Sequence, residues 1–183
     1  MIDNMEKKDW HIVPECYIDT SLVEFLLASH GVNHQKGCNN VAKTMKETKL
    51  KDQFSIGVID NDKKQPRSYV NEFNEIAHSE HILLLKHCER PHYIVKIAPA
   101  MDQFIMDCAA EQSINLQDYN LPSKLEEFTK ATKDVNVKSD PRFKSLFKAL
   151  CDSKEMKLLC NVLNYLNEQQ YECDIVKLQE LFG

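Results

Sequence analysis

The sequence predicts an α/β fold, in which a mostly parallel sheet flanked by helices is followed by an all-helical C-terminal extension. Three patterns lead to this prediction. Residues 54–59 are almost entirely apolar, as in a strand that is buried on both faces of a parallel sheet. A short apolar segment at 10–15 precedes apolar residues at helical spacing. From about residue 122 onward, helical spacing continues to the end of the chain.

The N-terminal part is expected to form two strands with two helices between them. In chain order these elements cover residues 10–15 (strand), 19–29 (helix), about 39–49 (helix) and 54–60 (strand). Asp19 or Thr20 would cap the first helix, because either side-chain oxygen can accept a backbone N–H of the first turn. Gly31 would end this helix, since glycine readily adopts the left-handed conformation of a helix stop.

The following part carries a basic loop, a helix and a hairpin. In chain order we expect a loop at 63–68, a helix at 71–78 and strands at 81–86 and 93–97. Lys63, Lys64 and Arg67 give the loop its positive charge. The two strands are joined by a short turn, which favours antiparallel pairing because parallel strands need a long crossover.

Helices account for the rest of the chain. One begins at a proline and carries Asp102 in its first turn, since proline suits the first helical position. Asp140 precedes a proline and is placed to cap another helix. We therefore expect an α/β domain over residues 10–115 and a helical extension over 116–183 that packs on it.

The composition is typical of a soluble globular protein. The chain has 183 residues and a net charge of −5, and no apolar run approaches the ~20 residues of a membrane-spanning helix. Seven cysteines are dispersed without a CxxC motif, which indicates reduced thiols and a cytoplasmic location. The negative net charge disfavours nucleic-acid binding by bulk electrostatics, so any such binding should depend on a divalent cation or a partner.

Acidic residues follow both of the predicted parallel strands. Glu15 ends the first strand, and Asp60 and Asp62 end the second. The carboxyl ends of parallel strands meet at one sheet edge, where ligands of α/β proteins bind. Carboxylates gathered there repel one another unless a cation neutralises them, and hard oxygen ligands suit Mg²⁺ or Mn²⁺. A plain polar turn at 60–62 is the alternative interpretation.

Four short segments resemble a TOPRIM domain, the metal-binding α/β unit of primases, topoisomerases and the overcoming-lysogenization-defect (OLD) nucleases. They are residues 15–19 after the first strand, 37–41 before the second helix, 59–62 after the second strand and 98–106. The last two segments supply an Asp-x-Asp pair and a proline followed by an acid and an aromatic residue. The resemblance covers roughly residues 10–110.

This resemblance implies a metal-dependent nuclease or a related phosphodiester-cleaving protein. Glu15 would act as a general acid/base or a ligand, and Asp60 and Asp62 would bind the metal. Asp19 and Asp102 would complete one or two metal sites. Lys63 and Lys64, with Arg67 in the same loop, would contact nucleic acid, and Lys63 is included among the catalytic candidates. A separate ATPase subunit as partner, and the oligomeric state, are left open.

Two departures from the TOPRIM pattern favour an alternative, a catalytically inactive module that acts through a protein partner. Cys16 stands where the family usually has glycine, and Asp102 stands where small relatives often have glutamate. Cys16 is also a nucleophile candidate, although no histidine lies near it in the sequence. A haloacid dehalogenase-type phosphatase is disfavoured because its Asp-x-Asp normally follows the first strand. A nucleotide-sugar transferase is disfavoured because the chain is short.

Overall fold

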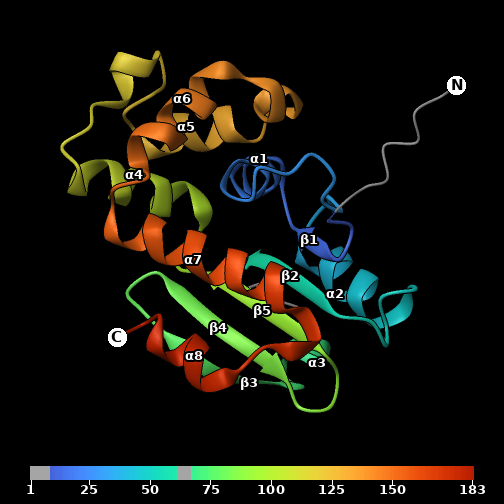
Figure 1. Ribbon diagram of the computed structural model, residues 1–183. Helices are drawn as coiled ribbons and strands as arrows, with labels where there is room; N and C mark the ends of the chain where they lie inside the picture. Colours follow the sequence, from blue (N-terminus) through green and yellow to red (C-terminus); the bar gives the residue numbers. More distant parts are fainter. Residues whose placement is uncertain (1–8, 62–66) are drawn as a thin grey trace, which may run out of the picture.

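The computed structural model describes residues 9–61 and 67–183, without the side chain of Arg67, and within them the chain forms an α/β fold around one mixed sheet (Figure 1). The strands are β1 (Ile12–Pro14), β2 (Ser55–Asp60), β3 (Phe73–His78), β4 (Ile82–His87) and β5 (His92–Ile97), in the spatial order β1-β2-β5-β4-β3. Parallel pairing joins β1 to β2 and β2 to β5, whereas β4 pairs antiparallel with both β5 and β3. Four of the five strands therefore run in the same direction.

Helices cover both faces of this sheet and extend beyond it (Figure 1). The α-helices are α1 (Tyr17–Leu26), α2 (Cys38–Glu47), α3 (Arg67–Val70), α4 (Met101–Glu111), α5 (Leu125–Thr132), α6 (Pro141–Leu150), α7 (Lys154–Gln169) and α8 (Ile175–Glu180). Short 3-10 helices are η1 (Leu116–Tyr119), η2 (Val135–Ser139) and η3 (Gln170–Glu172). Among the described residues, no helix is both long and apolar enough to cross a membrane.

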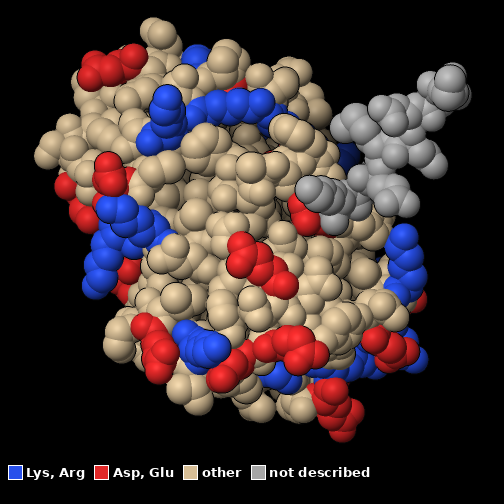
Figure 2. All heavy atoms as spheres, in the orientation of Figure 1, with Lys and Arg blue, Asp and Glu red and all other residues tan. Residues whose placement is uncertain are grey.

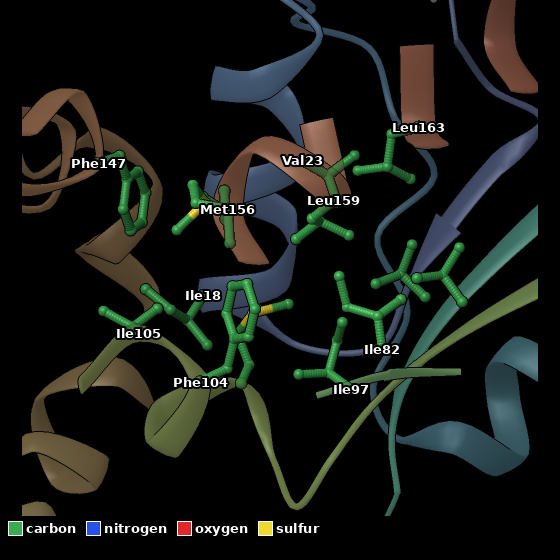
Figure 3. Packing of buried hydrophobic residues seen from close by; sticks show 14 of the residues in the cluster. Ile18, Val23, Ile82, Ile97, Phe104, Ile105, Phe147, Met156, Leu159 and Leu163 are labelled. Carbon is green, nitrogen blue, oxygen red and sulfur yellow. The ribbon is translucent and has the colours of Figure 1, made fainter. Parts of the chain in front are cut away.

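The larger hydrophobic cluster joins the sheet to the C-terminal helices. Figure 3 shows Ile82 and Ile97 of the sheet beside Phe104 of α4 and Leu159 and Leu163 of α7. All five side chains are fully buried. The expected helical extension thus shares a core with the α/β part, because α7 supplies apolar side chains to the same face of the sheet as α4.

The other face of the sheet is covered by α2 and α3. Gly57 of β2 allows α2 to approach closely, because a Cβ at this position would lie 2.9 Å from Met45 Sδ and 3.1 Å from Val41 Cγ1. Val41 and Met45 are buried in the smaller hydrophobic cluster on this face. This contact fixes α2 alongside β2, with the helix N-terminus at the carboxyl end of the strand.

Several predicted elements are confirmed, namely the strand at 54–60, the antiparallel hairpin and the helical C-terminal part. The expected helix at 71–78 is wrong, because residues Phe73–His78 form β3. Phe73, Ile76 and Ala77 have helical spacing because a β-bulge between Glu75 and Ala77 interrupts the alternation of this edge strand. Pairing with β4 therefore overrides the local pattern.

The boundaries of the first helix were also predicted wrongly. Cys16 is the N-cap of α1, and Asp19 is the third helical residue rather than the cap. The helix ends at Leu26, and Ala28, not Gly31, adopts a left-handed conformation with φ +48°. Farther along, Asp140 does cap α6, by accepting the backbone N–H of Arg142 at 2.9 Å.

Candidate metal centre

Glu15 and Asp60 lie side by side at the carboxyl ends of β1 and β2. The backbone N–H of Glu15 donates to the carbonyl oxygen of Val58 at 3.0 Å, which extends the parallel pairing by one residue. The Glu15 carboxylate then accepts the backbone N–H of Asp60 through Oε2 at 3.1 Å. The two acids that end the parallel strands are therefore in direct contact, as the sequence predicts.

Asp60 also lies at the N-terminus of α4. Its Oδ1 accepts the backbone N–H of Met101, the first residue of the helix, at 2.8 Å. A carboxylate is favourable at this position because the first N–H groups of a helix have no partner within the helix and carry partial positive charge. The contact brings Asp102, in the first turn of α4, to the same end of the sheet.

Asp19 approaches this pair from α1 and is completely buried. Its Oδ2 accepts the backbone N–H of Cys16 at 3.2 Å, whereas its Oδ1 is buried with no hydrogen-bond partner among the described residues. Burial, and then repulsion from Asp60 and Glu15, raise the pKa of Asp19 well above its usual value. A buried carboxylate with one unsatisfied oxygen costs folding free energy, so its position calls for an explanation.

A cavity of 310 Å³ opens over these acids. Its lining includes Glu15, Asp60 and Asp102, together with two cations, Lys36 from the loop before α2 and Lys133 at the end of α5. The lining of the cavity thus combines carboxylates with lysines from two further segments of the chain. Such a cavity can accept a cation on the carboxylates and an anionic group beside the lysines.

Four of the five predicted metal ligands lie at this end of the sheet: Glu15, Asp60 and Asp102 line one cavity, and the buried Asp19 is close enough to Asp60 and Glu15 for their charges to raise its pKa. Asp62, Lys63 and Lys64 lie outside the described residues, and Arg67 begins α3. Sequence reasoning missed Lys36 and Lys133. Lys36 directly precedes the segment 37–41, which could have drawn attention to it, but Lys133 gave no signal because only the packing of α5 brings it to the cavity.

The donor set suits a hard divalent cation, because all four acids offer carboxylate oxygens. The buried, unsatisfied Oδ1 of Asp19 also fits a missing positive partner. As the side chains stand, however, no three or more His, Cys, Asp or Glu groups within residues 9–61 and 67–183 are arranged to hold a metal ion. Binding would therefore require the acidic side chains to reorient, or Asp62 to contribute.

Cys16 fits neither a strained turn nor a reactive nucleophile. Its backbone is extended, with φ −133° and ψ 179°, so a Cβ is accommodated where TOPRIM domains usually have glycine. Burial and the neighbouring Asp19 raise the pKa of the Cys16 thiol, which keeps it protonated. The thiolate is the nucleophilic form of cysteine, so the structure argues against nucleophilic catalysis by Cys16.

A larger cavity of 680 Å³ lies between the β3–β4 turn, α4 and α7, but Ser79, His81 and Glu155 in its lining serve the fold. Glu155 accepts hydrogen bonds from Ser79 Oγ at 2.6 Å and from the backbone N–H of His81 at 3.2 Å. The ring of His81 contacts the carbonyl oxygen of Ala98 through Nδ1 at 2.9 Å. These groups are satisfied within the protein, unlike Asp19.

Comparison of the chain with protein-family models, with curated proteins and with solved structures finds no match in any of the three. The interpretation of the cavity therefore depends on the chemistry of the residues around it.

Proposed function

We propose that this chain is a TOPRIM-like protein that cleaves phosphodiester bonds of nucleic acid with the help of bound Mg²⁺ or Mn²⁺. The observation that carries the proposal is the buried Asp19, whose unsatisfied Oδ1 lies in a cluster with Glu15 and Asp60. Purely structural carboxylates are rarely gathered at the cost of mutual repulsion. A cation between them would remove both the repulsion and the unsatisfied oxygen.

The residues around the cavity would divide the work as follows. Asp19, Asp60 and Asp102 would hold the cation. The bound cation would act as a Lewis acid and polarise an oxygen of the scissile phosphate. Glu15 lines the cavity and would accept the proton of the attacking water as a general base. Its contact with the backbone of Asp60 keeps its carboxylate beside the metal ligands.

Lys36 and Lys133 would bind the phosphates of the substrate. Both line the cavity that contains the acids, although Lys36 belongs to the α/β part and Lys133 to the helical extension. Lysine binds phosphate as a point charge and needs no fixed geometry. We propose that the helical extension completes the substrate site in this way. The nucleic-acid contacts predicted for Lys63, Lys64 and Arg67 concern side chains outside the described part of the chain and stay predictions.

Cleavage of labelled single- and double-stranded DNA and RNA, with Mn²⁺, Mg²⁺ or EDTA, tests the proposal. We expect metal-dependent cleavage that Asp60→Asn reduces by more than the ~10- to 100-fold typical of losing a residue that only supports a ligand. Asparagine retains an oxygen for the N–H of Met101, so the start of α4 should remain intact. Asp118→Asn, at an exposed acid of η1, is the matched control and should cleave like the wild type.

A second candidate function is a non-catalytic binding module that acts through a protein partner. It is favoured by the contacts of Glu15, Asp19 and Asp60, because each carboxylate accepts a backbone N–H and so also serves the fold. The apolar stripes of the helical extension would not provide its partner surface, since Phe128 and Phe143 are completely buried. Calorimetric titration with Mn²⁺ discriminates the candidates: a module without catalysis should bind no metal at millimolar concentration.

A further inference from the structure

A cavity lined by aromatic side chains lies at the opposite edge of the sheet from the acids. It has a volume of 540 Å³, and its lining includes Trp10 and His11 just before β1, Phe54 just before β2, and Tyr171 in η3. Because β1 and β2 are parallel, their amino ends share this edge, whereas Glu15 and Asp60 mark the carboxyl edge. Trp10 is the single tryptophan of the chain.

Tyr171 is held rigidly but remains exposed. Its hydroxyl accepts the backbone N–H of Phe54 at 2.9 Å and donates to Oε1 of Gln53 at 3.0 Å. Its ring lies 5.9 Å from that of Phe54, and the residue is 57% exposed. Gln170 before it has φ +48°, an unusual conformation for a residue other than glycine. A fixed, exposed ring loses little conformational freedom when a flat ligand stacks on it.

Helix α2 connects the two cavities. Gly37, its N-cap, lines the acidic cavity, whereas Lys49, just after its end, lines the aromatic cavity. The ammonium group of Lys49 lies 5.5 Å from the centre of the Trp10 ring, in a cation–π arrangement. The two sites are separated by the length of β2, which at ~3.3 Å per residue amounts to roughly 20 Å. A chain of a few nucleotides would span this distance.

The surface along α2 is positively charged although the protein as a whole is acidic. The segment 36–53 contains two acids, Glu47 and Asp52, and five lysines, Lys36, Lys43, Lys46, Lys49 and Lys51. The net charge of the whole chain is −5. All of these lysines except Lys46, which pairs with Glu72 at 3.7 Å, are exposed. Figure 2 shows basic side chains, with acidic ones beside them, at the edge of the molecule where Figure 1 places α2.

We propose that single-stranded nucleic acid binds along α2, with an unpaired base in the aromatic cavity and the backbone on the lysines that lead to the acidic cavity. A basic groove with aromatic stacking platforms is the usual means of holding a single strand without sequence preference. Bases within a duplex are stacked on one another, so they cannot stack on Tyr171 or Trp10. The choice of nucleic acid as the ligand rests on the proposed function. The exposed aromatic rings then favour single strands over duplexes as the form of nucleic acid that binds.

Fluorescence of Trp10 tests this proposal directly, because no other tryptophan contributes to the signal. Oligo-dT, oligo-U and a blunt DNA duplex are titrated into the full-length protein in EDTA, at low and at moderate salt. We expect both single strands to quench the fluorescence and the duplex not to do so at the same concentration. Absence of quenching by both single strands at low salt would overturn the proposal, and so would equal quenching by the duplex.

Variants separate stacking from electrostatic contacts. Tyr171→Ala should weaken oligo-dT binding roughly 5- to 140-fold, the range for losing one base–aromatic stack, whereas Tyr171→Phe should keep most of the affinity. Thermal unfolding of both variants identifies any loss of fold. Because Tyr171→Phe removes the hydroxyl contacts but keeps the ring, it separates the effect of losing those contacts from the effect of losing the stacking surface. Equal affinity of Tyr171→Ala and the wild type would contradict the proposal.

Lysine variants test the path of the backbone. Lys43→Ala should reduce the slope of log affinity against log salt by ~0.7, the contribution of one phosphate contact on a single strand. Lys144→Ala, at an exposed lysine of α6, is the matched control and should leave the slope unchanged. Equal effects of the two variants would show that binding does not follow α2.

The binding assay in EDTA and the cleavage assay with Mn²⁺ test the two proposals separately, so one proposal can fail while the other holds. If the strand binds along α2 but no metal yields cleavage, the proposed function is wrong and the binding surface stands. If cleavage depends on Asp60 but neither Tyr171→Ala nor Lys43→Ala changes the affinity, the binding surface is wrong and the proposed function stands.

Discussion

Replacing Asp19 with asparagine should stabilise the protein at neutral pH while removing its proposed metal ligand. In the wild type, Asp19 Oδ2 accepts the backbone N–H of Cys16, and the buried Oδ1 has no partner among the described residues. Asparagine can keep the first contact through its carbonyl oxygen. Its NH₂ group would replace the unsatisfied oxygen close to the negative charges of Asp60 and Glu15.

The size of this stabilisation follows from the unsatisfied oxygen. Leaving a buried polar group unpaired costs about 1–3 kcal/mol, and repulsion among carboxylates adds to that cost. We therefore expect Asp19→Asn to raise the free energy of unfolding by about 1–3 kcal/mol at pH 7 in EDTA. For a chain of this size, each kcal/mol corresponds to roughly 2–4 °C in melting temperature.

The gain should depend on pH in a defined direction. Folding raises the pKa of Asp19, so below the ordinary value of 3.8 the carboxyl group is protonated in both states and carries no penalty for ionisation. As the pH rises above that value, Asp19 ionises first in the unfolded state. The free energy of unfolding of the wild type therefore falls until the pH passes the folded-state pKa of Asp19. Asparagine has no such penalty, so the difference between variant and wild type should grow from pH 4 towards neutrality.

Urea denaturation followed by circular dichroism, at pH 4 and at pH 7, measures this difference. Adding millimolar Mn²⁺ should then stabilise the wild type and not the variant, because a ligand stabilises only the state that binds it. An Asp19→Asn variant that is less stable than the wild type at pH 7 in EDTA would refute the reasoning. It would mean that the hydrogen bonds that Asp19 accepts outweigh the cost of burying its charge.

Three further predictions concern the fold and the thiol at the site. Gly57→Ala should destabilise the protein by about 1 kcal/mol in urea denaturation, the low end for overpacking, because the side chain of Met45 can yield. Asp140→Ala should lower the free energy of unfolding by about 0.5–2 kcal/mol in the same measurement, whereas Asp140→Asn should lower it less because it retains an N-cap acceptor for Arg142. Hydrogen bonds from Arg142 lower the pKa of Asp140. The extra stability of the wild type over Asp140→Ala should therefore disappear as the pH falls through that pKa. Cys16 should react with iodoacetamide in the folded protein far more slowly than in urea, as mass spectrometry of the labelled peptides would show.

Local signals were sufficient to predict much of the fold. The strand β2 was predictable because its apolar run is continuous, and the start of α6 because Asp140 precedes a proline. The edge strand β3 was not, since its bulge places Phe73 and Ile76 at helical spacing. The start of α1 was missed because cysteine is an unusual N-cap and gives no capping signal.

Only the part of the site that follows from the parallel pairing of β1 and β2 could be predicted from the sequence. Parallel strands place their carboxyl ends at one edge, which is sufficient to bring Glu15 to Asp60. The burial of Asp19 could not be foreseen, because it depends on how α1 packs on the sheet and on α4. Lys133 lies far from the acids in the sequence, and only the packing of the helical extension brings it to the same cavity.

Anomalous diffraction from a crystal soaked in Mn²⁺ tests the central claim most directly. We predict a peak in the cavity between Glu15 and Asp60, within the ~2.0–2.3 Å coordination distance of carboxylate oxygens, with Asp19 reoriented towards it. The peak should be absent from crystals of Asp60→Asn treated in the same way. A well-soaked wild-type crystal with no peak in this cavity, or with manganese only elsewhere on the surface, would contradict the claim that these carboxylates form a metal centre.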